Sequence, residues 1–156
     1  VSIALTSCLE QSALDPSVLD TWTQIRTNNG LAGDDVTAIF EDGKGNIWFG
    51  TTAGLSMYNQ NSFTSFRKNN GIASNYITSI TQDNDGSIWV GTDAGLSIYV
   101  DNSWVVPEVF LDIPITALLE TSGGRIVVGT ACCGAFEFRT DDDNFYYFYN
   151  PTSCAP

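Results

Sequence analysis

The chain has 156 residues, with 6 lysines and arginines against 18 aspartates and glutamates, giving a formal net charge of −12 at pH 7. This charge repels the phosphate backbone of nucleic acids and no basic cluster offsets it, so nucleic acid is excluded as a partner. The sequence has no histidine, which excludes Ser-His-Asp and Cys-His catalytic pairs, histidine metal ligands and imidazole acid–base chemistry.

The N-terminal segment, residues 1–21, allows two interpretations. Its start, VSIALTSC, resembles the end of a bacterial lipoprotein signal in which Cys8 would receive the lipid. A full signal also has a basic start and a longer apolar core, and both are missing here. The alternative is an apolar β-segment that serves as an assembly arm, with Cys8 in a disulfide. Both interpretations predict a location outside the cytoplasm, and a lipid on Cys8 is the one membrane contact expected.

Two stretches that lie 41 residues apart are nearly identical: NGLAGDDVTAIFEDGKGNIWFGTTAGLSMY at 29–58 and NGIASNYITSITQDNDGSIWVGTDAGLSIY at 70–99. A weaker third copy occupies 115–138, with Val127 in the tryptophan position and one extra residue before Gly134. A period near 40 residues with strand-like interiors is typical of β-propeller blades. The predicted fold class is therefore all-β, with three four-stranded antiparallel blades.

Each repeat divides into four predicted strands, A to D, which we place in chain order. The A strands are 36–42, 77–83 and 115–121; the B strands are 46–51, 87–92 and 125–130; the C strands are 55–58, 96–99 and 135–138; the D strands are 63–67, 104–109 and 145–149. The blades then span about 22–67, 68–109 and 110–149, and residues 150–156 form a C-terminal tail. The A–B links, GKGN and NDGS, have the composition of tight hairpin turns.

Structural roles are predicted for the repeated tryptophans and glycines. Trp48 and Trp89 should be buried on B strands, each against an adjacent blade. The three equivalent glycines should let a neighbouring backbone approach closely; they are Gly50, Gly91 and Gly129. The stretch Asp83–Gly86 resembles the opening of a calcium loop but lacks the ligating glutamate, so a turn is the preferred interpretation. We expect no metal and no cofactor.

The pattern D-x-x-G-x-I-W-[FV]-G-T-x-x-G-L-S-x-Y in the first two copies resembles the two-component regulator propeller repeat. The resemblance covers roughly residues 22–149. It implies bacterial propeller blades outside the cytoplasm, in the periplasm, at the cell surface or secreted, that bind ligands or proteins. It carries over no catalytic residue, because the motif positions are turn glycines and packing tryptophans.

Three blades cannot close a ring, because propellers close with about four to eight blades. A fourth D-like segment, 22–26, precedes the first blade, so we predict a spare outer strand containing Trp22 and Ile25. Two explanations are open. The chain is a piece of a longer propeller, or the spare strand completes the third blade of another copy by strand addition. The second explanation predicts a homo-oligomer, either a dimer or a filament.

The four cysteines are Cys8, Cys132, Cys133 and Cys154. An even number, with one near each end of the chain, is typical of a disulfide-bonded protein outside the cytoplasm. Adjacent cysteines pair with each other only through a strained ring, so Cys132 and Cys133 should have different partners. Cys8 and Cys154 are the candidates, within a chain or between chains.

A binding site, if present, should lie where the D–A and B–C loops meet at one end of the blades. The candidate residues are Asp34, Asp35, Thr52, Asn75, Tyr76, Asp93 and Asp112. The copies diverge at these positions, as loops released from packing constraints do. The predicted function is non-enzymatic binding of a small molecule or a protein. The alternatives are a structural subunit that self-assembles by strand exchange and, more remotely, an enzyme that uses loop carboxylates such as Asp34 and Asp35.

Overall fold

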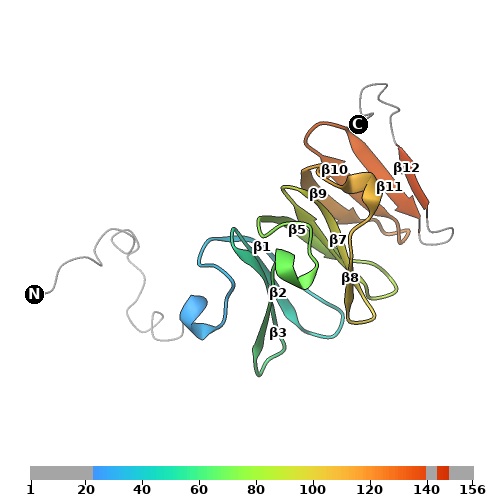
Figure 1. The fold of residues 1–156 in the computed structure, drawn as a ribbon. Helices are drawn as coiled ribbons and strands as arrows, with labels where there is room; N and C mark the ends of the chain where they lie inside the picture. The colour runs from blue at the N-terminus through green and yellow to red at the C-terminus, as the bar shows by residue number, and fades with distance from the viewer. Residues whose placement is uncertain (1–22, 140–143, 148–156) are drawn as a thin grey trace, which may run out of the picture.

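The protein forms three four-stranded antiparallel sheets that follow one another along the chain (Figure 1). The structure is a computed structural model and describes residues 23–139 and the strand Asn144–Tyr147. The predicted segments 1–21 and 150–156, with Cys8, Trp22 and Cys154, lie outside the described residues. The only helices in the described part are three single 3-10 turns: η1 (Thr27–Asn29), η2 (Lys68–Asn70) and η3 (Glu108–Phe110). The predicted all-β fold class is confirmed.

Each sheet is a meander in which neighbours in sequence are neighbours in the sheet. Blade 1 contains β1 (Val36–Glu41), β2 (Ile47–Thr51), β3 (Gly54–Tyr58) and β4 (Phe63–Phe66). Blade 2 contains β5 (Ile77–Gln82), β6 (Ile88–Thr92), β7 (Gly95–Val100) and β8 (Ser103–Val105). Blade 3 contains β9 (Ile115–Glu120), β10 (Ile126–Thr130), β11 (Ala135–Arg139) and β12 (Asn144–Tyr147). The innermost strands stand side by side, β5 between β1 and β9, as expected of propeller blades.

Two predicted strands differ from the structure. Strand β8 ends at Val105 rather than at residue 109, because Pro107 has no N–H to donate and the chain then turns into η3. The spare outer strand is also absent as a strand in its described part: residues 23–26 are irregular and exposed. A strand needs a partner for its backbone hydrogen bonds, and this segment pairs with none of the described strands.

The hydrophobic core lies between the blades. One cluster joins blades 1 and 2 and contains Trp48, whose ring stacks on Phe66 and meets the edge of Tyr99 from blade 2. The other joins blades 2 and 3 and contains Trp89, whose ring contacts Phe138 of blade 3. Both tryptophans are 1 % exposed. Each indole therefore fixes one blade against the next.

Two of the repeated glycines face a side chain of the following blade. A Cβ at Gly50 would lie 2.6 Å from Ile77 Cγ2, and one at Gly91 would lie 2.8 Å from Ile115 Cγ2. The close approach thus comes from side chains and not from a neighbouring backbone: at both positions from an isoleucine at the start of the next inner strand, and at Gly91 also from Ser79 Oγ of the same blade, at 2.5 Å. At Gly129 the nearest atom would be 3.4 Å away, because no further blade follows among the described residues.

Replacing Trp48 with alanine should lower the free energy of unfolding by about 3–5 kcal/mol, the usual cost of truncating a buried aromatic side chain. Urea denaturation followed by circular dichroism measures the change. Val127→Ala is the matched control, because Val127 has the same position in blade 3 but no blade packed over it among the described residues. A Trp48→Ala midpoint close to that of the parent would contradict the packing described above.

Candidate binding face

The D–A loops and the B–C turns lie at the same end of each blade, because both connect strand ends of one polarity in an A–B–C–D meander. We call this end the loop face; its segments are 27–35, 67–76 and 106–114 with the turns 52–53, 93–94 and 131–134. One backbone hydrogen bond ties the loop to the turn in every blade: Thr52 N–H to Asp35 O at 3.1 Å, Asp93 N–H to Tyr76 O at 3.2 Å, and Ala131 N–H to Pro114 O at 3.0 Å. The loop face is therefore built on a repeated frame.

Asp34 and Asn75, two of the predicted site residues, fold the D–A loops. Asp34 Oδ1 accepts a hydrogen bond from the Thr27 N–H at 2.7 Å, and Asn75 Oδ1 accepts one from the Lys68 N–H at 2.8 Å. The two residues hold the same position in the repeat. The first copy has aspartate at this position and the second has asparagine, so the sequence alone indicates divergence. Both side chains offer the same carbonyl-type acceptor, so the divergence conceals one structural role.

The other predicted site residues leave their side chains toward solvent. Asp35, Asp93 and Asp112 are exposed, Tyr76 is 44 % exposed, and Thr52 is half-buried. Asp112 has a left-handed backbone, with φ of 59°, and its N–H donates to Ala94 O of blade 2 at 3.1 Å. This bond joins the third D–A loop to the turn of the preceding blade. The loop face thus presents five exposed acidic side chains and one aromatic ring on a fixed backbone, against two exposed basic side chains; the acidic residues are Asp34, Asp35, Asp93, Glu108 and Asp112, and the basic ones are Arg67 and Lys68.

The B–C turns share a pair of hydrogen bonds made by a threonine hydroxyl, and the turn that contains the two cysteines keeps them. Thr51 Oγ1 donates to Gly54 O at 2.7 Å and accepts from the Ala53 N–H at 3.1 Å. In blade 3, Thr130 Oγ1 donates to Gly134 O and accepts from the Cys133 N–H, both at 2.9 Å. Cys133 therefore takes the place of Ala53, and Cys132 is the inserted residue.

Cys133 is disulfide-bonded. The Sγ atoms of Cys132 and Cys133 lie 3.0 Å apart. Cys8 and Cys154, the partners that the sequence suggests, are outside the described residues, so the connectivity stays a prediction.

The carboxylates at the opposite end of the blades bind the tryptophans. Asp42 Oδ1 accepts from the backbone N–H of Lys44 and of Asn46, both at 2.9 Å, and Asp42 Oδ2 accepts from Trp48 Nε1 at 2.9 Å. Asp83 makes the equivalent bonds, including one from Trp89 Nε1 at 2.8 Å. Burial raises the pKa of Asp42, but the hydrogen bonds from Trp48, Asn46 and Lys44 outweigh burial and hold that pKa below its ordinary value.

The aspartates at this end thus have a structural role that excludes Asp83 as the start of a calcium loop, since both of its oxygens are already engaged in the turn and the indole. Among the described residues, no three acidic or cysteine side chains gather in a way that could hold a metal ion. An aspartate stands six residues before both Trp48 and Trp89, and this spacing is the signal in the sequence for the aspartate–indole bond, which the analysis of the repeat did not identify.

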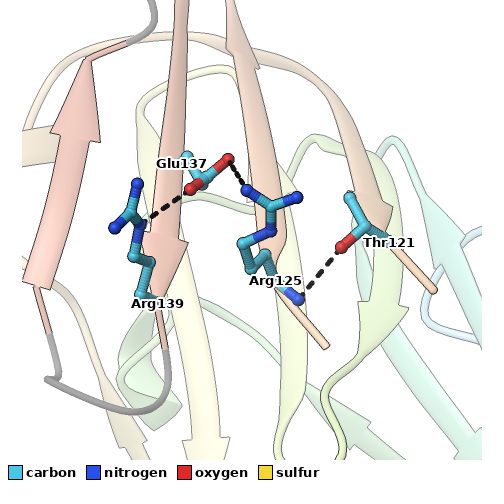
Figure 2. A network of polar contacts seen from close by, with 4 residues as sticks. All are labelled: Thr121, Arg125, Glu137 and Arg139. Atoms are coloured by element: carbon cyan, nitrogen blue, oxygen red, sulfur yellow. Dashed lines mark hydrogen bonds and ion pairs between the residues drawn. The ribbon is translucent and has the colours of Figure 1, made fainter. Parts of the chain in front are cut away.

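Blade 3 replaces this arrangement with an ion network (Figure 2). Thr121 stands in place of the aspartate, and its Oγ1 accepts from the Arg125 N–H at 3.1 Å. Glu137 is 5 % exposed and accepts from Arg139 Nε and from Arg125 Nη1, both at 2.9 Å. The bond from Arg139 and then that from Arg125 hold the pKa of Glu137 below its ordinary value, against the opposing effect of burial. Loss of the tryptophan and loss of its aspartate therefore coincide in one blade.

Asp42→Ala should destabilise the protein by about 1–3 kcal/mol at pH 7, because the buried Trp48 N–H loses its acceptor. The folded pKa of Asp42 lies below the unfolded value, so its contribution is complete above about pH 4 and is lost as the pH falls through the folded pKa. The difference in free energy of unfolding between parent and variant should therefore decrease over that pH range, as measured by urea titrations at several pH values. Asp85→Ala, an exposed residue of the equivalent turn, is the control, and a gap that persists unchanged at pH 2 would count against the bond.

Comparison with known proteins connects this frame to a family. A family model described as two component regulator propeller matches residues 30–53 and 71–94, which run from the D–A loop to the B–C turn of blades 1 and 2. No curated protein matches the chain. Within the described residues, no helix is long and apolar enough to cross a membrane.

Solved structures with similar blades come from B. thetaiotaomicron. The extracellular domain of the putative hybrid two component system BT3049 is similar with a TM-score of 0.68 and 25% identity, over 80% of this chain and 18% of that one. The extracellular domain of the putative hybrid two component system BT4673 is similar with a TM-score of 0.62 and 26% identity, over 72% of this chain and 16% of that one. The chain thus spans less than a fifth of these proteins. Residues 30–53 and 71–94 thus match the two-component regulator propeller repeat, and the fold is that of the propeller blades in these extracellular domains.

Proposed function

We propose that these blades belong to an extracytoplasmic sensor propeller that binds a ligand or a protein at the loop face and catalyses no reaction. The observation that supports this proposal most strongly is that the backbone of the loop face is constant between blades while its exposed side chains differ. The same loop-to-turn bond recurs in all three blades, while the residues around it change from Asp35 and Thr52 to Tyr76 and Asp93. A constant backbone with variable exposed side chains suits recognition rather than packing. The similarity to extracellular domains supports the location.

The roles of the buried carboxylates support a non-enzymatic function. Asp42, Asp83 and Glu137 are the buried acidic residues among those described. Asp42 and Asp83 accept hydrogen bonds from turn amides and an indole, and Glu137 accepts from two arginines. Each of the three carboxylates is engaged by structural donors, and the chain has no histidine to act as a base. The buried carboxylates of the described residues therefore serve the structure, which supports a function without catalysis.

The charge of the loop face favours a cationic or neutral polar ligand. Five exposed acidic side chains outnumber two exposed basic ones there, Arg67 and Lys68, and Tyr76 presents an aromatic ring. Acidic side chains attract cations and an aromatic face adds to that attraction. Strand exchange between copies, the alternative from the sequence, stays a prediction; blade 3 already has β12 as its own fourth strand, which leaves it less need of a strand from another chain.

Nuclear magnetic resonance titration of the full chain with trilysine and, separately, triglutamate tests the proposed face. Trilysine should shift the amide resonances of the loop face, and triglutamate should not. Asp93→Asn should weaken trilysine binding about two- to fivefold, the value of one exposed charge pair. The matched control is Asp101→Asn, which removes the same charge from the C–D turn at the other end of blade 2. Equal weakening by both variants, or shifts centred on the A–B turns, would contradict the proposal.

A further inference from the structure

The third D–A loop exposes large aliphatic side chains, whereas the first two loops bury theirs. Leu31 in the first loop and Ile72 in the second are 5 % and 2 % exposed. In the third loop, Val109 is 43 % exposed and Leu111 is 58 % exposed. We call these two residues the aliphatic pair. Apolar side chains that are exposed next to one another mark interaction sites more often than single ones do, so the pair calls for a partner.

The exposure of the aliphatic pair follows from the way the third loop folds. This loop is three residues shorter than the second, counted from the aromatic residue of the D strand to the isoleucine that begins the next A strand. The shorter loop contains η3, whose Phe110 is fully buried, with its ring centroid 4.9 Å from that of Phe136. Successive residues of a 3-10 turn point in different directions, so the anchored ring leaves Val109 and Leu111 on the outside.

Acidic side chains enclose the aliphatic pair. Glu108 comes directly before the pair and Asp112 directly after it, and both are exposed. Asp93, in the B–C turn of blade 2, is exposed as well. The backbone holds this turn beside the third loop, because Ala94 O accepts a hydrogen bond from the Asp112 N–H at 3.1 Å. Carboxylates thus stand on both sides of an apolar centre.

Tyr76 extends this surface across the same turn. Its carbonyl oxygen accepts from the Asp93 N–H at 3.2 Å, and its side chain is 44 % exposed. The turn 93–94 therefore lies between the loop of Tyr76 and the loop of the aliphatic pair. We call the whole area the loop-3 surface; its residues are Tyr76, Asp93, Glu108, Val109, Leu111 and Asp112.

The exposed basic residues of the loop face lie outside the loop-3 surface. Arg67 Nη2 donates to Ala32 O of the first loop at 3.2 Å, which directs this guanidinium toward blade 1. Lys68 follows it, and its N–H donates to Asn75 Oδ1 at 2.8 Å, so its charge borders the second loop and not the third. The loop-3 surface itself has three carboxylates and no basic residue. A partner has to supply positive charge.

We infer that the loop-3 surface binds a peptide segment in which an aliphatic side chain lies between two basic ones. This inference rests on the proposed function and narrows the ligand class at the same face. The aliphatic side chain of the segment covers Val109 and Leu111. One basic side chain meets Asp93, and the other meets Glu108 or Asp112.

Charge and apolar contact are both needed to match this surface. A simple amine neutralises one carboxylate and leaves the aliphatic pair in water. A purely apolar ligand covers the pair and leaves the surrounding carboxylates without a counter-charge. A segment with both kinds of side chain complements the apolar centre and the acidic rim together. In an extended peptide, side chains two residues apart point to the same side, so a basic–x–aliphatic–x–basic pattern presents all three groups to the surface.

Three pentapeptides test the inference on the full chain by nuclear magnetic resonance titration. They are Lys-Gly-Leu-Gly-Lys, Lys-Gly-Ser-Gly-Lys and Glu-Gly-Leu-Gly-Glu. The first should bind about fivefold more tightly than the second, because partial burial of one leucine side chain is worth about that factor. The third should not bind, because its charges repel the carboxylates. Shifts from the first peptide should centre on residues 108–112.

A matched pair of variants assigns the apolar contact to the third loop. Leu111→Ser should remove the preference for the leucine peptide and leave the affinity for the serine peptide unchanged. Leu119→Ser is the control, because Leu119 is a leucine of almost equal exposure, 59 % against 58 %, in the inner strand of blade 3 and outside the loop face. This control should keep the full preference. Circular dichroism and urea midpoints of both variants verify that the fold is retained.

The possible failures are distinguishable. Equal affinity for the leucine and serine peptides, with shifts still on the loop face, would overturn the inference and leave the proposed cation binding intact. Failure of both lysine peptides to shift the loop face would overturn the two proposals together. Binding of neutral phosphatidylcholine vesicles that Leu111→Ser abolishes would assign the aliphatic pair to a membrane and overturn the peptide inference. Sedimentation of the full chain as a dimer that Leu111→Ser dissociates would assign it to a second copy, with the same consequence.

Discussion

The hydrogen bond between a buried aspartate and a buried indole is the interaction on which the blade structure depends. In blades 1 and 2 the carboxylate binds the A–B turn through one oxygen and the tryptophan through the other. It thereby joins a turn, a strand and the interface with the next blade. A carboxylate buried without such donors would be costly, and an indole N–H buried without an acceptor would cost about 1–3 kcal/mol. Blade 3 shows the alternative, since Thr121 and Val127 replace both members together and an arginine–glutamate network covers that side.

The repeat predicted the sheets well because strand period and turn composition are local properties of the sequence. The positions of Trp48 and Trp89 followed from the same pattern. The turn composition predicts only a turn role for the aspartates that bind them. The sequence nevertheless shows an aspartate six residues before Trp48 and Trp89, and a threonine in that place in blade 3, where the tryptophan is lost. The loss of both the aspartate and the tryptophan from the third copy is the sign in the sequence that the two residues act together.

Other features could not be predicted because they depend on residues distant in sequence. Residues 23–26 have the composition of an outer strand but are not one, since strand structure needs a neighbouring strand. The sequence predicts Asp34 and Asn75 as variable site residues, although each fixes a loop through the same type of acceptor. Gly50 was expected to admit a backbone, and instead it admits the Ile77 side chain of the next blade. In each case the structure depends on a second residue or strand that the local sequence pattern does not identify.

These features together connect the fold with the proposed function. Loops fixed by repeated bonds hold the exposed side chains of the loop face in place, so a ligand would meet a surface that is already organised. The blades lie between that face and the A–B turns, where the aspartate–tryptophan pairs lie. The ligand face and the stabilising pairs therefore occupy opposite ends of the same strands, which lets the loop residues vary without loss of the core.

A double-mutant cycle on Asp83 and Trp89 tests most directly whether the aspartate–indole bond organises the blade. Trp89→Phe keeps an aromatic ring and removes the N–H, and Asp83→Ala removes the acceptor. Urea unfolding of the parent, both single variants and the double variant gives the coupling free energy. The structure predicts a coupling of about 1.5–3 kcal/mol, the contribution of a hydrogen bond to a charged group. A coupling near zero would show that the carboxylate and the indole act independently and would contradict this account.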